Sequence, residues 1–408
     1  MKILHVNMTS SGGGLEQYLL RLSEELHCRG HESFLLFGEA SSGPPLPFRA
    51  QLYCIDSITH PHCKDLADKL AATSEILDRE RPDLVFFHQV LNPRLVDLLS
   101  KAYPSIRFAH GFKMVCPDGR KTLKTRKVFC EFPLSYLCQP RAYRYRCMPR
   151  NIFQGVPAIS GSKRIAQIHK ERSYTIVASQ FMKKVMLCNG FNEERIAVIP
   201  PFTTLPDLES RNSFNDPPMI ISVGRVVKEK GMDHLLQAFV SLKQKAKIVI
   251  IGDGPFLNEL KSLAQRLGII SDVSFPGWLS PNELKSYYQR CRMVVVPSTW
   301  PEPFGMVGIE AMSYGKPVLA FDVGGISEWL KHEETGFLVK PKDSVALAEK
   351  ISFLLERPEL ASKIGNKGRE AVRVRFVPGV HVDQLFSVFH RAIDFFKQNP
   401  NLRSHSAR

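Results

Sequence analysis

Glu302 and Glu310 are two carboxylates separated by a short apolar segment that contains glycine, residues 303–309. Prolines before this segment keep the chain extended, and the residues from Met306 onward favour a helix that ends at Gly315. We expect Glu302 just before that helix and Glu310 about two turns inside it. Carboxylates accept hydrogen bonds from sugar hydroxyls, and the unpaired amides of a helix N-terminus donate to phosphate or hydroxyl oxygens. The pattern therefore favours a site that suits a sugar nucleotide.

The glutamate pair lies between two apolar, β-branched runs, residues 293–298 and 317–321. Such runs are typical of buried parallel strands. The pair would then occupy a loop at the carboxyl end of a parallel sheet, where ligands bind in open α/β folds. The alternative is that Glu302 is an exposed loop residue and Glu310 a solvated helix residue. The flanking strands favour the ligand site.

A second candidate site follows the expected strand 219–223, where Gly224 and Arg225 precede Lys230 and a helix. Glycine allows a ligand to come close to the backbone, arginine offers a planar fork of donors, and lysine offers a point charge. With the helix amides, these cations would clamp a diphosphate. Charged loops after strands are common, so this motif alone does not decide the function.

Two further loops have glycine at the expected ends of strands. Gly252 and Gly254 follow residues 246–251, and Gly277 and Trp278 follow residues 273–276. Each is by itself a common tight turn, although backbone groups of the second could read the edge of a nucleobase. Together with the other two motifs, four successive loops at one sheet edge would carry sugar, phosphate or base contacts.

In this order, the four loops resemble the motifs of the family 4 glycosyltransferases, which have the GT-B fold. The resemblance is close over residues 220–355. It is looser in the first half, where it rests on Gly12 to Gly14, on His110 with Gly111, and on residues 178–200. It implies retaining transfer of a sugar from a nucleotide diphosphate donor, a UDP- or GDP-sugar, to an acceptor hydroxyl, with no metal ion or other cofactor required.

The resemblance also implies roles for individual residues. Arg225 and Lys230 would neutralise the departing diphosphate, Glu310 would hold the ribose hydroxyls, and Glu302 would bind donor-sugar hydroxyls near the reacting carbon. Breaking the anomeric bond adds negative charge to the diphosphate, so fixed cations stabilise the transition state more than the ground state. The implied catalytic residues are Glu302, His110, Arg225 and Lys230. The implied donor-binding residues are Gly14, Gly224, Arg225, Lys230, Gly252, Gly254, Gly277, Trp278, Glu302, Phe304, Gly305, Met306 and Glu310.

His110 follows the expected strand 106–109 in the first half. The resemblance implies that this histidine contacts the transferred sugar from the other side of a cleft, whereas a lone histidine after a strand is otherwise more often structural. Many relatives carry aspartate next, where Gly111 stands here. The glycines 12–14 would let the first-half loop approach the donor phosphates or the acceptor; a merely flexible loop is the alternative.

Strands alternate with helices in both halves, which predicts parallel sheets covered on both faces. We expect an α/β chain of the GT-B type, with two Rossmann-like doubly wound domains facing each other across a cleft. The expected domains are an acceptor domain over residues 1–203 with a basic insertion at about 112–150, a donor domain over 204–381, and a returning C-terminal helix and tail over 382–408. A linker rich in proline, asparagine and serine is expected at 203–218. In the first half, the expected strands are 2–7, 32–37, 84–88, 106–109, 174–178 and 196–199, with helices near 15–30 and 66–79. In the second half, the expected strands are 219–223, 246–251, 273–276, 293–297 and 317–321, with helices near 232–243, 256–267, 282–290 and 305–314. Beyond Ser344 the chain is expected to be helical, with an interruption at Pro378 and Gly379 before a last helix at 382–396.

The formal net charge is +15, and basic residues far outnumber Asp118 and Glu131 between residues 113 and 150. This surface favours an anionic acceptor or anionic lipid headgroups, with a simply solvated basic loop as the alternative. Nucleic acid is disfavoured because no RNA-binding aromatic signature, helix-turn-helix or zinc-finger spacing is present. No apolar run reaches the roughly 20 residues that span a bilayer, and the N-terminal apolar segment is too short for a signal peptide. We expect a cytoplasmic protein with possible peripheral contact at the inner face of the membrane.

Four of the nine cysteines cluster in the basic insertion, namely Cys116, Cys130, Cys138 and Cys147. Their gaps are too wide and irregular for the CxxC pairs of common zinc sites. A structural metal or iron–sulfur site that ties down this loop is one reading, and unligated thiols are the other. No metal is expected in catalysis.

The sequence therefore favours a retaining glycosyltransferase for cell-surface polysaccharide, lipopolysaccharide or glycolipid synthesis. Two alternatives stay open: a nucleotide-sugar hydrolase or epimerase of the same fold, and a noncatalytic nucleotide-sugar-binding protein. A dinucleotide-dependent dehydrogenase is disfavoured because Gly12 to Gly14 do not supply a GxGxxG spacing after the first strand.

Overall fold

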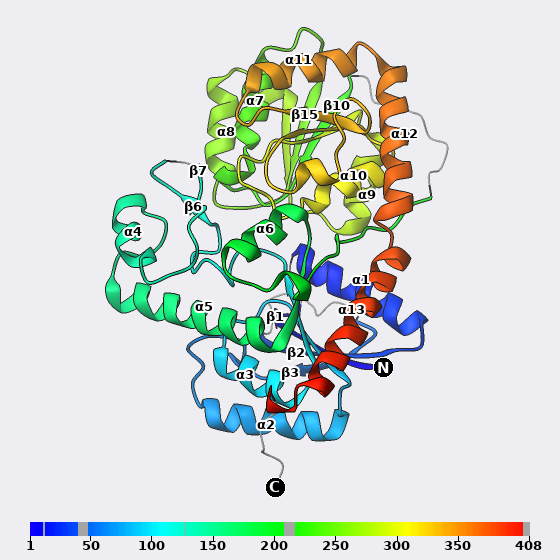
Figure 1. Cartoon of the computed structure of the whole chain (residues 1–408). Helices are drawn as coiled ribbons and strands as arrows, with labels where there is room; N and C mark the ends of the chain where they lie inside the picture. The colour runs from blue at the N-terminus through cyan, green and yellow to red at the C-terminus, as the bar shows by residue number, and fades with distance from the viewer. Residues whose placement is uncertain (11–12, 40–47, 127, 208–216, 403–408) are drawn as a thin grey trace. The chain divides into compact units, whose positions relative to one another are not determined.

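The contacts of the chain divide it into two units. The computed structural model describes residues 1–10, 13–39, 48–126, 128–207 and 217–402. The first unit comprises Met1–Pro200 and His381–Arg408, and the second comprises Pro201–Val380 (Figure 1). We predicted domain boundaries after residues 203 and 381, whereas the chain passes from one unit to the other after residues 200 and 380. The predicted linker 203–218 falls largely outside the described residues.

The first unit contains a seven-stranded parallel sheet with the order β3-β2-β1-β4-β5-β8-β9. The strand order reverses beside β1, so β1 and β4 form the switch point of this sheet. Its strands are β1 (Lys2–Thr9), β2 (Glu32–Glu39), β3 (Gln51–Cys54), β4 (Leu84–Phe87), β5 (Ser105–Ala109), β8 (Ser173–Val177) and β9 (Ile196–Val198). Its main helices are α1 (Gly14–Cys28), α2 (Leu66–Glu80), α3 (Pro93–Ala102), α5 (Ile152–Arg172), α6 (Gln180–Cys188) and α13 (Pro378–Gln398).

Both faces of this sheet are apolar, which explains the continuous hydrophobic runs of its strands. Phe87 faces a core formed with α2, α3 and α5. The next residue along β4, Phe86, faces the opposite way and packs on Phe389 of α13 with ring centroids 5.6 Å apart. On that same face Tyr18 of α1 meets Phe108 at 5.6 Å. The C-terminal helix is therefore one of the layers of the first unit.

Two contacts near the start of α13 are polar. The Tyr18 hydroxyl lies 2.8 Å from His381 Nε2, and His381 Nδ1 lies 2.7 Å from the Pro200 carbonyl. The carbonyl can only accept, so Nδ1 carries the proton and Nε2 accepts from Tyr18. Arg29 at the end of α1 pairs with Asp383.

The second unit contains a six-stranded parallel sheet with the order β12-β11-β10-β13-β14-β15. Its order reverses between β10 and β13, so the loops after these two strands meet at a switch point. The strands are β10 (Met219–Val223), β11 (Lys247–Ile251), β12 (Val273–Gly277), β13 (Met293–Val296), β14 (Val318–Phe321) and β15 (Gly336–Val339). The helices are α7 (Met232–Val240), α8 (Leu257–Arg266), α9 (Pro281–Arg290), α10 (Met306–Ser313), α11 (Ser344–Leu355) and α12 (Pro358–Arg375).

The predicted α/β class with two doubly wound parallel sheets is confirmed. The prediction did not include β3, β15, α3, α5 or α6, and it extended α7 to residue 243 although the helix ends at Val240. The basic insertion contains two short antiparallel strands, β6 (Thr122–Leu123) and β7 (Val128–Phe129), and helix α4 (Cys138–Tyr145). None of the helices in the described part of the chain combines the length and apolarity needed to cross a bilayer.

Candidate functional site

Two of the predicted site residues form an ion pair at the switch point of the second unit. Lys230 Nζ donates to Glu302 Oε1 at 2.6 Å, and the Ser298 hydroxyl donates to the same oxygen at 2.7 Å. The Glu302 side chain is 6% exposed and that of Lys230 is 30% exposed. The structure therefore brings together a cation and a carboxylate that the sequence had placed on separate loops.

The loops that carry this pair are bound to each other through their backbones. The Thr299 amide donates to the Glu229 carbonyl at 2.9 Å. Gly231 has φ +65°, and a Cβ atom on it would lie 2.0 Å from the Pro297 carbonyl oxygen. Only glycine allows this approach without a shift of the backbone. Lys230 is thereby held beside the loop that leads to Glu302.

Glu302 is also fixed through its own backbone. Its carbonyl accepts from the Gly325 amide at 2.8 Å. Gly324 has φ +61°, and a Cβ atom there would lie 2.2 Å from the same carbonyl oxygen. The loop after β14 therefore buttresses Glu302, a support that the sequence analysis did not identify.

Helix α10 starts directly after the Glu302 loop. Gly305 is its N-cap residue with φ +94°, and in the described part of the chain no side chain caps it by hydrogen bonding. The first-turn amides at Met306 are therefore donors that a ligand can use. Glu310 is the fifth residue of α10 and so lies little more than one turn inside it, not two turns as predicted, because the helix begins only at Met306.

The Phe304 side chain is buried and packs on Phe376, with ring centroids 5.7 Å apart. The Phe304 carbonyl accepts from Trp329 Nε1 at 2.6 Å. The side chain of Phe304, a predicted donor-binding residue, is thus anchored in the core of the second unit. Its backbone amide is the group that can contact a ligand directly.

The glycine loops after β10, β11 and β12 form one continuous layer of backbone. The Gly224 amide donates to the Ile251 carbonyl at 3.0 Å, and the Gly252 amide donates to the Gly277 carbonyl at 2.8 Å. A Cβ atom on Gly252 would lie 2.0 Å from the Gly224 carbonyl oxygen, and one on Gly254 would lie 2.4 Å from the Val226 carbonyl oxygen. The four predicted glycines are therefore neighbours along one sheet edge.

Two exposed side chains project from this layer. Arg225 follows Gly224 and is exposed, and Trp278 follows Gly277 and is 67% exposed. An exposed cation beside glycine loops suits phosphate oxygens, and an exposed indole offers a flat surface to a base.

In the first unit, His110 is the end of a chain of three histidines. His5 Nδ1 lies 3.1 Å from His88 Nε2, and His88 Nδ1 lies 3.0 Å from His110 Nε2. Burial lowers the pKa of both His5 and His110 to about 3, and burial lowers the pKa of His88 well below its ordinary value. All three rings are therefore neutral near pH 7, and His110 can act only as a neutral hydrogen-bonding group.

His110 also lines a cavity of about 250 Å³ in the first unit, together with His88, Gly111, Arg107 and Lys113. Arg107 is 4% exposed, and its Nε and Nη1 atoms are buried with no hydrogen-bond partner among the described residues. Burial lowers the pKa of Arg107 to about 10, so the guanidinium is still charged at neutral pH. The sequence analysis missed Arg107, although a single arginine inside the apolar run 106–109 was a visible signal.

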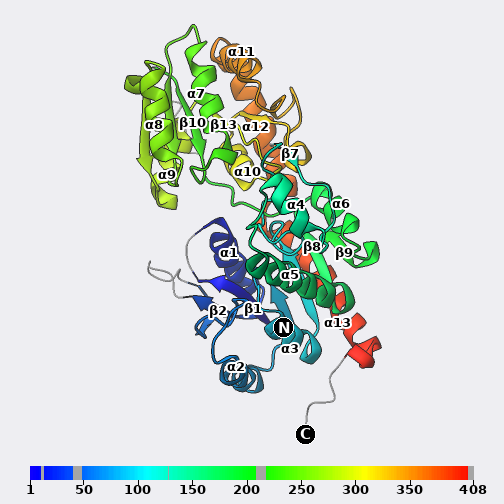
Figure 2. The same ribbon diagram turned by 90° about the vertical axis from the view of Figure 1, so that its left-hand side faces the viewer.

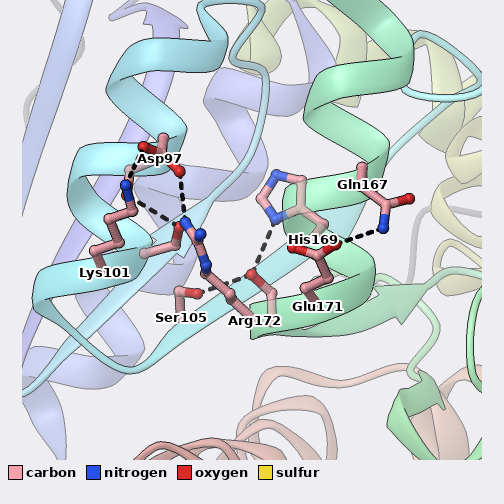
Figure 3. A network of polar contacts seen from close by, with 9 residues as sticks. Asp97, Lys101, Ser105, Gln167, His169, Glu171 and Arg172 are labelled. Carbon is pink, nitrogen blue, oxygen red and sulfur yellow. Dashed lines mark hydrogen bonds and ion pairs between the residues drawn. The ribbon is translucent and has the colours of Figure 1, made fainter. Parts of the chain in front are cut away.

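The strand that carries Arg107 and His110 is tied to two helices by the polar network in Figure 3. Ser105 of β5 shares a 2.8 Å hydroxyl contact with Ser173, and His169 of α5 lies 3.0 Å from that same Ser173 hydroxyl. Arg172 of α5 pairs with Asp97 of α3 at 2.5 Å. These contacts fix the start of β5, at the end of the strand opposite to His110.

The glycine loop after β1 is partly described. Gly14 is the first residue of α1, and the Gly13 amide donates to Glu16 Oε2 at 2.9 Å. Glu16 is buried and also accepts from the Thr9 hydroxyl at 2.6 Å. A carboxylate of the chain itself therefore occupies this helix start. Gly12 lies outside the described residues.

The chain shares the GT-B fold with solved structures. The crystal structure of Anabaena Alr3699/HepE in complex with UDP matches 96% of this chain and 100% of its own, with a TM-score of 0.72 and 19% sequence identity. At this identity the match establishes the shared fold.

The family follows from the sequence. The model named Glycosyltransferase Family 4 matches residues 12–205, and the model named Glycosyl transferases group 1 matches residues 206–371. The chain therefore belongs to the glycosyltransferases of family 4, group 1, as the motifs predicted.

Curated relatives match over part of their length. An uncharacterized glycosyltransferase of Methanocaldococcus jannaschii is 35% identical over 164 residues, which are 40% of this chain and 42% of the relative. The GDP-mannose-dependent alpha-(1-6)-phosphatidylinositol monomannoside mannosyltransferase of Mycobacterium tuberculosis is 30% identical over 179 residues, 42% of this chain and 46% of the relative. The chain thus spans less than half the length of these two proteins in the matched regions.

Proposed function

We propose that this protein is a retaining glycosyltransferase that moves a sugar from a UDP- or GDP-sugar to a hydroxyl of a glycan or glycolipid. The observation that carries the proposal is the Lys230–Glu302 pair at the switch point of the second sheet. Beside this pair lie exposed Arg225, the layer of glycine loops and the uncapped start of α10. These groups offer cations and amides for a diphosphate and a carboxylate for sugar hydroxyls.

The ion pair suggests how the donor is held. An ammonium has three donors, so Lys230 can keep its hydrogen bond to Glu302 and still donate to a phosphate oxygen. Its charge, with that of Arg225, would oppose the negative charge that builds up on the departing diphosphate. These cations can supply the neutralising charge that a catalytic metal ion would otherwise provide, so we propose a reaction without one.

Glu302 is suited to orient the donor sugar. Ser298 and Lys230 both donate to Oε1, which leaves Oε2 to accept from a sugar hydroxyl. A nucleotide diphosphate is already a good leaving group, so the carboxyl pair of glycoside hydrolases is not needed. We assign Glu302 to sugar binding and not to covalent attack.

For the first unit we propose acceptor binding in the cavity beside His110. The buried Arg107 and the exposed Lys113 line this cavity and would attract an acceptor with a negatively charged group. A neutral His110 would donate or accept a hydrogen bond with a sugar hydroxyl.

We also propose that the first unit contacts anionic lipid at the cytoplasmic face of a membrane. Helices α4 and α5 lie side by side (Figure 2), and exposed apolar side chains occur on and next to these helices among exposed arginines. Phe153 is 83% exposed and Leu137 is 60% exposed, and Arg144 and Arg150 are exposed nearby in the sequence. Apolar side chains that enter the interface, together with cations that attract headgroups, are typical of peripheral membrane binding.

The first test of the proposed reaction is a panel of UDP-, GDP- and ADP-sugars. One donor should raise the melting temperature by mass action, and the protein should then transfer that sugar to an acceptor extract. Glu302→Gln and Lys230→Met should bind less donor and turn over at least about 100-fold more slowly. Near-normal transfer by either folded variant would exclude that residue from the mechanism.

Product analysis separates the alternatives. A glycoside supports the transferase, free sugar supports a hydrolase, a changed donor sugar supports an epimerase, and donor binding without any turnover supports a binding protein. For the membrane, Phe153→Ser with Leu137→Ser should weaken co-sedimentation with anionic vesicles, whereas the matched change Val374→Ser, at a 59% exposed valine of the second unit, should not. Equal sedimentation of both variants would exclude this surface.

A further inference from the structure

The four clustered cysteines line one small hollow in the first unit. Cys116 follows β5, Cys130 follows β7, Cys138 is the first residue of α4, and Cys147 follows that helix. All four line a single cavity of about 30 Å³, and each is a half-buried free thiol. The fold thus gathers side chains whose sequence spacing gave no metal-binding pattern.

A tight turn holds Cys116 close to the segment that carries Cys130. The Gly119 amide donates to the Cys116 carbonyl at 2.9 Å, and the Cys130 amide donates to the Lys121 carbonyl at 2.7 Å. Gly119 has φ +75° and Lys121 has φ +50°, and a non-glycine residue in this region is under strain of order 1 kcal/mol. The backbone therefore fixes two of the four cysteines on neighbouring segments.

Two cations face the same hollow. Lys121 is 3% exposed, lines the hollow and donates to the Phe132 carbonyl at 2.7 Å. Arg141 also lines it, lies over the Phe132 ring at 4.0 Å, and has an Nη1 atom that is buried with no hydrogen-bond partner among the described residues. Buried cations are costly unless a negative charge lies near them. The carboxylate of Asp118 also lines the hollow, but it already pairs with Arg120 and Lys124, and four neutral thiols add no negative charge.

We propose that Cys116, Cys130, Cys138 and Cys147 bind one zinc ion as four thiolates. Each thiol loses its proton to solvent and forms one Zn–S bond, so the site carries a net charge of −2 and involves no oxidation or reduction. That charge matches Lys121 and Arg141. Zinc is the ion for which a closed site of four thiolates is the usual structural arrangement.

Metal-free thiols are protonated near neutral pH, because the ordinary pKa of a cysteine is about 8.5. Among the described residues, no group of three or more ligating side chains already stands at metal-binding spacing. The thiols must therefore draw together as the ion enters, and binding must release protons.

The cysteine hollow lies where a bound metal ion would stabilise the surrounding structure. The insertion has only a small core of its own, built on Ala142, Met148 and Ile159. Small structures of this kind commonly need a metal or a disulfide to hold them. The segment that begins at Phe112 also links two cavities, because Met114 and Gly119 line the His110 cavity while Cys116 lines the cysteine hollow. Zinc would thus fix one wall of the His110 cavity.

The test starts from the full chain, purified without chelators and, in parallel, reconstituted with zinc chloride alone. Elemental analysis should find about one zinc per chain, and X-ray absorption should find four sulfur atoms at about 2.3 Å. Zinc addition to the reduced, metal-free chain should release protons to a pH indicator.

Variants provide the control. Cys116→Ser and Cys147→Ser should lose most of the zinc, whereas Cys188→Ser, at an exposed cysteine of α6, should keep it. If the first two variants do not fold, the X-ray absorption result on the unchanged chain decides. The proposal is overturned by a chain that takes up no zinc on reconstitution, by fewer than four sulfur ligands, by iron–sulfur absorption, by disulfides among these cysteines, or by full zinc content in either variant.

Discussion

Removal of the Lys230 charge tests the contact on which the donor site depends. In Lys230→Met the stem of the side chain stays but Glu302, whose side chain is 6% exposed, keeps only the Ser298 hydroxyl as a donor to Oε1. Breaking a fully buried pair costs roughly 3–5 kcal/mol. Because Lys230 is 30% exposed, water can partly replace it, and we expect a loss of about 2–3 kcal/mol in the free energy of unfolding.

The three tryptophans of the chain provide the assay. Trp278, Trp300 and Trp329 all lie in the second unit, so tryptophan fluorescence reports the unfolding of that unit. For a domain of this size, the expected loss corresponds to a melting temperature lower by about 4–12 °C. As a control, Lys243→Met removes an exposed lysine of the same unit and should change stability by less than about 0.5 kcal/mol.

A double-mutant cycle isolates the pair from other effects. Glu302→Gln keeps an oxygen for the Ser298 hydroxyl and leaves the half-exposed Lys230 to water, so it should cost only about 1 kcal/mol. The double variant Lys230→Met with Glu302→Gln should then be more stable than the sum of the two single effects by about 1–2 kcal/mol. A coupling within about 0.5 kcal/mol of zero would refute the ion pair.

Three other predictions follow from packing and protonation. In Gly308→Ala the new Cβ atom would lie 1.9 Å from the buried Trp329 ring. The second unit should therefore lose about 3 kcal/mol in the free energy of unfolding, and the tryptophan emission should shift to the red; an unchanged melting curve would contradict this packing. Burial lowers the pKa of His5 to about 3 and that of His381 to about 4, below the unfolded value of about 6.5. As the pH falls, the unfolded chain therefore binds protons before the folded chain does. Between pH 7 and pH 5, each of these histidines lowers the free energy of unfolding of the first unit by about 2 kcal/mol. Amide hydrogen exchange should rise more in the first unit than in the second, and an equal rise would count against the neutral rings. Tyr18→Phe removes the hydroxyl that donates to His381 Nε2 and should cost about 1–3 kcal/mol. The same exchange experiment measures this loss, and unaltered protection of α1 would argue against the bond.

The sheet of the second unit was predictable because its strands are buried on both faces. The expected strand 219–223 coincides with β10, and the expected strand 293–297 exceeds β13 by one residue. Residue types in the following loops also identified Lys230 and Glu302 as candidates. Their direct contact was not predictable, since it requires that β10 and β13 be neighbours, and that adjacency is set by hydrogen bonds between segments far apart in sequence.

Other elements escaped prediction because local signals opposed them. Helix α5 contains Gly155 and Pro157, which disfavour a helix interior. Tertiary packing explains the glycine: a Cβ atom at Gly155 would lie 2.0 Å from the Gln139 side chain of α4. Arg107 was hidden for a similar reason, because hydrophobic periodicity assigns a strand without showing where a single charge within it will point.

The position of α13 has a consequence for how the protein is made. This helix covers one face of the first sheet, through contacts such as Phe86 with Phe389, yet it is synthesised after the whole second unit. On the ribosome, the nascent first unit must therefore wait with an uncovered apolar face until the last helix emerges. A chain released early, after Pro200, would lack that layer and should be a preferred target of chaperones and proteases.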